Sequence, residues 1–305
     1  MTLLPHQSDK RFVVWTGMET DLIFNQGIDL PGFASFPLLE KEDTRLLLAD
    51  YVKRQIDLAA RHGIGTILES VTWMANADRA RALGYNEQGL ITVNRDAIGF
   101  LAEIRSEHDT SNVLISANIG PRRDAYTADQ TMSPDDAESY HAAQIASLIG
   151  TEIDLLSAYT LSNSPEAIGI ARAANKLSIP CVIAFTVETD GRLPSGQQLD
   201  DAIAQTDAAT NTSPVYYMIN CAHPDHFADK LSGNTRIRGV VVNASRCSHA
   251  ELDEATQLDD GDPVELAEQV AGLLRAHPAL GVFGGCCGTD LRHLDAMAKR
   301  VGAIQ

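Results

Sequence analysis

Eight short apolar segments, spaced along the 305-residue chain, constrain its fold most strongly. They are rich in valine, isoleucine and leucine, and they do not alternate strictly between apolar and polar residues. Strands that are buried on both faces of a parallel sheet have this pattern. The eight predicted strands are Phe12–Trp15, Ile64–Ser70, Val113–Ile119, Ile153–Tyr159, Pro180–Val187, Val215–Cys221, Ile237–Ala244 and Gly281–Cys287.

The segments between these strands carry the signals that start helices. Ser133-Pro134 supplies an N-cap and a first-position proline, and Asp135 and Asp136 follow in the first turn. Ser164-Pro165 and Asp262-Pro263 repeat the pattern before two later segments. We therefore expect helices to alternate with the strands.

Eight strands that alternate with helices predict a single (β/α)8 barrel of the TIM type over residues 1–305. No low-complexity linker divides the chain. The strands are expected to end near residues 15, 70, 119, 159, 187, 221, 244 and 287. An open, doubly wound α/β sheet is the alternative, but no Gly-x-Gly-x-x-Gly motif follows the first strand.

Charge and composition exclude several classes of partner. The formal net charge of −17 argues against nucleic acid, which needs clustered Lys and Arg, and against an anionic membrane surface. No stretch approaches the ~20 apolar residues of a membrane helix, and the N-terminus lacks the features of a signal peptide. Five cysteines, an odd number, do not indicate a disulfide framework. We expect a cytoplasmic protein, and the sequence leaves open whether it forms a homo-oligomer.

Active sites of such barrels lie at the C-terminal ends of the strands, so the residues there are candidates. Substrate contacts are expected from Gly17, Met18, Glu69, Asn118, Tyr159 and Asn220. The other residues at these ends are Trp15, Thr16, Thr160, Thr186, Glu188, Cys221, Asn243, Cys286 and Cys287.

A metal site is predicted from the cysteines in this group. Cys286 and Cys287 stand within the run Gly284-Gly285-Cys286-Cys287-Gly288. Neighbouring side chains of a regular strand point apart, but glycine permits backbone angles that could turn both thiols toward one point. Cys221 ends the sixth strand at the same mouth and supplies a third thiol. Three cysteines leave one tetrahedral position open, which is typical of catalytic zinc.

The remaining cysteines and nearby histidines fit other roles better. Cys181 opens the fifth strand, away from the mouth, and Cys247 lies in a loop after the seventh, so both are interpreted as buried small hydrophobic residues without a ligand role. His223 and His226 follow Cys221 closely, but this spacing is weak evidence for ligation. His293 in the last helix is interpreted as a helix-surface or capping residue.

These motifs resemble the homocysteine-binding domain of the homocysteine S-methyltransferases, a group that includes betaine-, S-methylmethionine- and cobalamin-dependent enzymes. The resemblance rests first on Asn220-Cys221 and on Gly-Gly-Cys-Cys-Gly-Thr at residues 284–289. It extends over nearly the whole chain. Further matching stretches are Thr16–Leu22, Ser116–Pro121, Ile153–Leu156 with Glu166-Ala167, and Asp262-Pro263.

The resemblance implies a (β/α)8 barrel in which Cys221, Cys286 and Cys287 bind Zn²⁺. It implies transfer of a methyl group from a sulfonium or ammonium donor to the thiolate of homocysteine, as in methionine biosynthesis. The metal would lower the pKa of the incoming thiol. The chain has no room for separate cobalamin or folate domains, so a donor that binds directly, such as S-methylmethionine, S-adenosylmethionine or betaine, is expected.

Two positions depart from the family pattern. The family usually has Asp-Gly after the first strand and Glu-Thr after the fourth, and both acids contact the homocysteine amine. Here the first pair reads Trp15-Thr16, and Tyr159 replaces the glutamate. Glu69 and Glu188 are candidates for a compensating charge, and Trp15 and Tyr159 could form aromatic walls for a cationic donor.

Three functions therefore remain open at this point. The first is a zinc-dependent S-methyltransferase that acts on homocysteine. The second is a methyltransferase for a different small thiol or a selenol, which the missing acids favour. The third is a barrel that binds zinc or thiols without catalysis.

Overall fold

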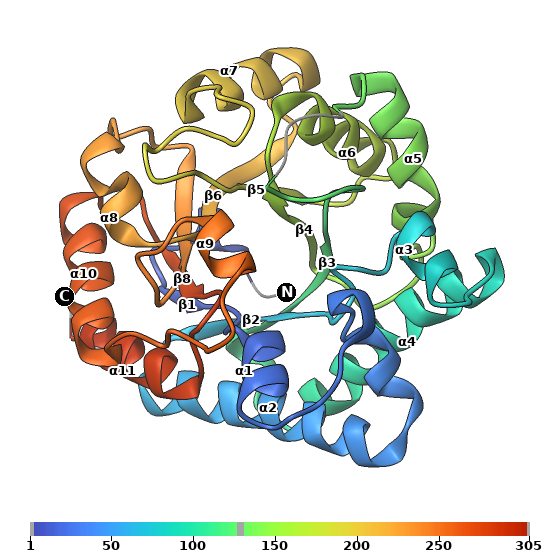
Figure 1. The fold of residues 1–305 in the computed structure, drawn as a ribbon, viewed down its shortest axis with the longest axis horizontal. Helices are drawn as coiled ribbons and strands as arrows, with labels where there is room; N and C mark the ends of the chain where they lie inside the picture. The colour runs from blue at the N-terminus through green and yellow to red at the C-terminus, as the bar shows by residue number, and fades with distance from the viewer. Residues whose placement is uncertain (1–2, 127–130, 304–305) are drawn as a thin grey trace.

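The computed structural model describes residues 3–126 and 131–303. Eight parallel strands close into one barrel in the order β1 to β8, and β8 pairs with β1. Helices surround the barrel, as Figure 1 shows. The strands are β1 (Phe12–Val13), β2 (Gly65–Glu69), β3 (Val113–Ile119), β4 (Leu155–Leu161), β5 (Cys181–Phe185), β6 (Pro214–Ala222), β7 (Ile237–Val242) and β8 (Val282–Gly285).

The prediction of a single (β/α)8 barrel is confirmed, and the doubly wound sheet is excluded. The helices are α1 (Met18–Phe24), α2 (Glu42–Arg61), α3 (Ala77–Ala82), α4 (Glu87–Ser106), α5 (Pro134–Ala146), α6 (Ser164–Lys176), α7 (Leu199–Thr210), α8 (Pro224–Phe227), α9 (His249–Asp253), α10 (Pro263–Ala276) and α11 (Leu291–Gly302). Short 3-10 helices span Pro5–Gln7, Pro31–Phe33, Phe36–Glu40, Thr110–Asn112 and Ala228–Lys230.

Two of the three predicted helix starts have the expected caps. The Ser133 hydroxyl accepts a hydrogen bond from the backbone N–H of Asp136 at the start of α5. Asp262 caps α10 in the same way, with Pro263 as its first residue. In α6 the cap is Asn163, one residue earlier than predicted, and Ser164 is the first helical residue.

The core has two parts, as expected for a barrel whose strands are buried on both faces. A larger set of buried apolar side chains fills the space between the strands and the helices. A smaller set, which includes Phe12, Ile67, Leu114, Leu155 and Tyr216, fills the barrel interior. Side chains alternate between the two along regular stretches such as Cys181–Phe185 of β5. The barrel is therefore a packed scaffold that presents its strand ends to one mouth.

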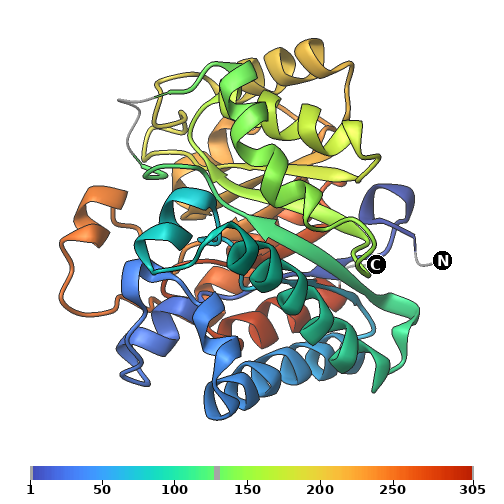
Figure 2. The same ribbon diagram turned by 90° about the vertical axis from the view of Figure 1, so that its right-hand side faces the viewer.

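Several strands end earlier than the sequence indicated. β1 stops at Val13 and β8 at Gly285, so Trp15, Cys286 and Cys287 lie in loops beyond the strands. Figure 2 shows α1 and α9 at one end of the barrel and the N-terminus at the other. Within the described residues, no helix is both long enough and apolar enough to cross a membrane.

Candidate metal centre and active site

Three thiols converge at the mouth of the barrel. The Sγ atoms of Cys221, Cys286 and Cys287 all lie within 4.8 Å of one another, and those of Cys221 and Cys287 are 3.5 Å apart. Cys221 belongs to β6, and the other two follow β8 directly. The sequence prediction brought these three residues together, and the structure has the same arrangement.

The adjacent cysteines face one point because they lie in a turn. The backbone N–H of Thr289 donates to the carbonyl of Cys286 at 3.0 Å, and Gly288 has a φ of 79°. Only Gly288 of the three flanking glycines has a positive φ. Gly284 and Gly285 are needed for a different reason: a Cβ at Gly285 would lie 2.0 Å from Thr289 Oγ1. The prediction that Cys286 and Cys287 belong to a twisted strand end is therefore wrong. They lie in a tight turn after β8, and close packing against Thr289 holds this turn in place.

Cys221 has a strained backbone. Its φ of 56° lies in the left-handed region, which is uncommon for a residue with a side chain. The pairing of β6 with β7 shifts register between Asn220 and Ala222, so Cys221 leaves the regular alternation. Such strain of about 1–3 kcal/mol is typical of functional sites, where the surroundings hold the residue in place.

His249, the first residue of α9, holds the backbone of Cys221. Its Nε2 lies 2.6 Å from the Cys221 carbonyl oxygen, and its Nδ1 lies 3.0 Å from Glu188 Oε1. Burial lowers the pKa of His249, but hydrogen bonds with Cys221 and Glu188 and the charge of Cys221 outweigh burial and raise the pKa to about 9. Glu188 is therefore paired with His249, contrary to the hypothesis that it supplies a free charge for a substrate amine.

Tyr126, in the loop after β3, contacts the thiol group from the other side. Its hydroxyl lies 3.0 Å from Cys221 Sγ, and its ring stacks on the His249 ring with centroids 4.0 Å apart. The other two cysteines contact the same sulfur, and their hydrogen bonds to Cys221 hold the pKa of the Cys221 thiol well below its usual value. Tyr126 and His249 were not predicted as site residues, since neither lies at a strand end.

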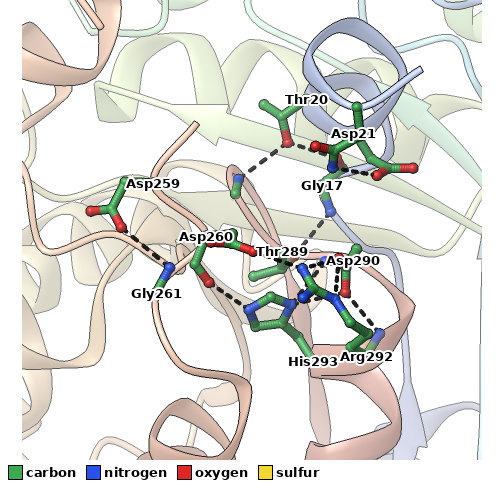
Figure 3. Close-up of polar contacts among 12 residues, drawn as sticks. Gly17, Thr20, Asp21, Asp259, Asp260, Gly261, Thr289, Asp290, Arg292 and His293 are labelled. Atoms are coloured by element: carbon green, nitrogen blue, oxygen red, sulfur yellow. Dashed lines mark hydrogen bonds and ion pairs between the residues drawn. The ribbon is translucent and has the colours of Figure 1, made fainter. Parts of the chain in front are cut away.

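The first turn of α1 is attached to the turn that carries the cysteines. The backbone N–H of Gly17 donates to Thr289 Oγ1 at 3.0 Å, and that of Gly288 donates to Thr20 Oγ1 at 3.1 Å, as Figure 3 shows. Thr20 Oγ1 in turn donates to the Gly17 carbonyl at 2.7 Å. These bonds fix α1 and the two cysteines relative to each other.

A second network in Figure 3 anchors the segment between α9 and α10. His293 Nε2 donates to the Asp260 carbonyl at 2.8 Å, and Arg292 pairs with the carboxylates of Asp260 and Asp290. His293 is buried at the start of α11 and caps it together with Asp290. Because the neighbouring Asp259 lines the cavity described next, this anchoring shapes the cavity wall.

A cavity of about 660 Å³ opens onto the thiols. Its walls come from the loops after the strands, from α1 and from the segment around α9. A cavity of this size suits a small organic molecule. Its aromatic lining residues are Trp15, Phe24, Phe33, Trp73, Tyr126 and Tyr159.

The predicted substrate contacts fall into two groups. Gly17, Asn118, Tyr159 and Asn220 line the cavity, as do the three cysteines. Met18 packs into the core instead, because it lies on the inner face of α1.

Glu69 also lies outside the cavity lining. It is 1% exposed, and its Oε1 accepts a hydrogen bond from the Tyr159 hydroxyl at 3.0 Å. Its Oε2 has no hydrogen-bond partner among the described residues. Burial raises the pKa of Glu69 to about 7. The carboxyl group thus lies beneath Tyr159, and the structure does not support a direct contact with substrate.

The other residues considered from the sequence have roles apart from the metal site. His223 caps α8, and His226 Nε2 lies 2.9 Å from the Arg246 carbonyl oxygen. Cys181 is buried at the start of β5, as expected. The expectation that Cys247 is buried is wrong, because it lies exposed in the loop after β7. None of these four belongs to the thiol cluster.

The donor set fits a zinc ion. Tetrahedral zinc with Zn–S bonds of about 2.3 Å places its sulfurs about 3.8 Å apart, close to the 3.5 Å between Cys221 and Cys287. Three thiols on one side and the cavity on the other match an ion with an open position. The cluster could therefore hold a metal with room for an additional ligand.

Comparison with known proteins places the chain in a family. Residues 17–301 match the family described as Homocysteine S-methyltransferase. The chain belongs to the homocysteine S-methyltransferase family. As a member of the family it is a methyltransferase.

Solved structures of the homocysteine methyltransferase MmuM from Escherichia coli share the fold. The metallated form is 17% identical, with a TM-score of 0.73 and 96% of each chain covered. The oxidized form is 18% identical, with a TM-score of 0.71, and covers 97% of this chain and 96% of its own. The same barrel therefore underlies both this methyltransferase and MmuM.

Proposed function

We propose that this family member is a zinc-dependent S-methyltransferase that methylates homocysteine to give methionine, with a sulfonium or ammonium compound as donor. The observation that carries the proposal is the convergence of three thiols on a cavity of about 660 Å³. The family description and the name of the MmuM enzyme support homocysteine as the thiol.

Cys221, Cys286 and Cys287 would hold the metal. Zinc bound by three thiolates would lower the pKa of the incoming thiol, so that the thiol is present as its thiolate at neutral pH. Asn220 holds the strand next to Cys221, and His249 holds the Cys221 carbonyl, so these contacts fix the position of Cys221.

The reaction needs no acid or base on the donor side. The thiolate sulfur attacks the methyl carbon in line and forms a new S–C bond, while the donor keeps the electron pair of the bond that breaks. The donor loses its positive charge, and the thiol proton has already left. Aromatic walls around the cavity, including Trp15 and Trp73, would stabilise the cationic donor.

One observation favours a second candidate, a different small thiol or a selenol. Trp15 and Tyr159 stand where acids that contact the homocysteine amine are expected, and the Tyr159 hydroxyl is engaged by Glu69. A substrate without an α-amino group would not need those acids.

The test is methyl transfer by zinc-loaded protein. Homocysteine and 4-mercaptobutyrate, which lacks the amine, would each be combined with S-methylmethionine, S-adenosylmethionine and betaine, and the products followed by mass spectrometry. We expect methionine from homocysteine with at least one donor. Turnover only of the thiol without an amine would support the second candidate, and no turnover with any pair would contradict both.

The chemistry of the cysteines suits a reducing compartment such as the cytoplasm. All five cysteines are free in the structure, including the three that would need to be reduced to bind zinc.

A further inference from the structure

Glu19, in the first turn of α1, is a buried carboxylate on the cavity wall. It is 8% exposed and lines the same cavity as Cys286 and Cys287. Its Oε1 accepts a hydrogen bond from the Ser35 hydroxyl at 2.9 Å. Among the described residues, no Lys, Arg or His forms an ion pair with it. Glu19 was not a candidate from the sequence, because it lies beyond the strand end, inside a helix.

A carboxylate that is buried without a cation destabilises the protein unless a ligand supplies the charge. Burial raises the pKa of Glu19, and hydrogen bonds from its own backbone, from Ser35 and from Trp15 only partly oppose this shift. Trp15 stands at the position where the family usually has an aspartate. Its side chain also forms a hydrogen bond with Glu19. A buried acid on a cavity wall, with no cation paired to it among the described residues, indicates a site for a positively charged group.

Glu19 is held at a fixed place beside the thiols. The bonds from Gly17 to Thr289 and from Gly288 to Thr20, visible in Figure 3, attach the first turn of α1 to the cysteine turn. Thr20 and Gly288, which are bonded to each other, are the residues next to Glu19 and Cys287, and both Glu19 and Cys287 line the cavity. A short thiol bound at the cysteines would have its other end near Glu19.

We propose that Glu19 binds the ammonium group of the amino-acid thiol substrate. This inference rests on the proposed function. It identifies Glu19 as the residue that favours a thiol substrate with an amino group over one without it. Glu19 would take over the role of the acids that are absent at positions 15 and 159.

The donor is also a cation, but other acids suit it better. Asp124, Asp253 and Asp259 line the cavity too, and all three are exposed. They lie where a donor would enter from solvent, whereas Glu19 lies inside, next to the cysteine turn. The thiol is therefore the substrate that Glu19 is placed to bind.

The test compares Glu19→Gln with wild type in the zinc-loaded protein. Homocysteine and 4-mercaptobutyrate would be titrated calorimetrically, and KM measured for both thiols and for the donor. Gln keeps the shape of the side chain and the bond from Ser35, and it removes a buried charge, so Tm should equal or exceed that of wild type. Asp21→Asn is the matched control, since Asp21 lies on the same helix and bonds to Asn25 and Gln26 instead.

We expect the Kd and KM for homocysteine to rise roughly tenfold to hundredfold in Glu19→Gln, as for the loss of one partner of a buried charge pair. The values for 4-mercaptobutyrate and for the donor should stay within about twofold, and Asp21→Asn should resemble wild type. Equal effects on both thiols, no effect on either, or a rise in the donor KM alone would overturn the assignment. If wild type binds 4-mercaptobutyrate but not homocysteine, Glu19 is not an ammonium site, while methyl transfer to that thiol would still support the second candidate function.

Discussion

The carbonyl oxygen of Cys286 occupies the space where a side chain at Gly17 would lie. A Cβ at Gly17 would be 2.2 Å from this oxygen and 2.9 Å from the Thr289 carbonyl oxygen. Both contacts are with backbone, which cannot move aside as a flexible side chain can. The glycine thus permits the close approach of α1 to the cysteine turn.

Gly17→Ala should therefore disrupt the metal site as well as the fold. We expect a loss of about 1–3 kcal/mol in the free energy of unfolding, as for overpacked sites, and a zinc content well below that of wild type. Thermal unfolding and metal analysis would check this. Gly99→Ala is the control, because Gly99 lies in helix α4 with no atom near its Cβ position, and it should be neutral or stabilising. A Gly17→Ala protein with full zinc content and normal Tm would contradict the role given to this contact.

Asn220 links β6 to the end of β4. Its Oδ1 accepts from the backbone N–H of Thr160, and its Nδ2 donates to Thr160 Oγ1, each at 2.8 Å. Thr160, like Cys221, has a positive φ, and both Asn220 and Thr160 are buried. The pair thus supports two strained positions at the barrel mouth.

Asn220→Ala should leave the Thr160 N–H without a partner. We expect a loss of roughly 2–3 kcal/mol in unfolding free energy, and weaker zinc binding because Cys221 is the next residue. Denaturant unfolding and competition with a zinc chelator would measure the two effects. Asn175→Ala, an exposed position in α6, is the control and should change neither. Zinc affinity that is unaltered in Asn220→Ala would show that Asn220 does not position Cys221.

Glu69 should make stability depend on pH. Its pKa is raised to about 7, so its protonated form is favoured by folding, and this contribution is lost as the pH rises through 7. Glu69→Gln removes the ionisation and keeps an acceptor for the Tyr159 hydroxyl. Relative to wild type, the variant should gain stability on the order of 1–3 kcal/mol between pH 5 and pH 8.

Urea unfolding at several pH values would test this prediction, with Glu254→Gln as an exposed control. A difference between Glu69→Gln and wild type that stays constant from pH 5 to pH 8 would mean that Glu69 titrates normally.

Much of the fold was predictable because it depends on repeated local patterns. Runs such as Val113–Ile119 and caps such as Ser133 each report on one strand or one helix, and eight repeats leave few topologies. The three thiols were predictable for the same reason: once the strands are counted, Cys221 and the pair at 286–287 must share a mouth.

The surroundings of the thiols could not be predicted in this way. Tyr126 and His249 reach Cys221 from loops, whose paths depend on tertiary packing. The charge of Glu188 could be read from the sequence but its pairing with His249 could not. The burial of Glu19 could not be predicted either, because it depends on the packing of α1 against the turn that carries Cys286 and Cys287.

The central claim is that Cys221, Cys286 and Cys287 bind the zinc ion on which methyl transfer depends. Zinc content measured by mass spectrometry on wild type and Cys286→Ala, after zinc loading and removal of loosely bound metal, tests it most directly. Cys247→Ala, an exposed cysteine outside the cluster, is the matched control. We predict about one zinc per chain in wild type and in Cys247→Ala, and a large loss in Cys286→Ala together with loss of methyl transfer. A wild-type protein that purifies without metal and takes up no zinc would contradict the account.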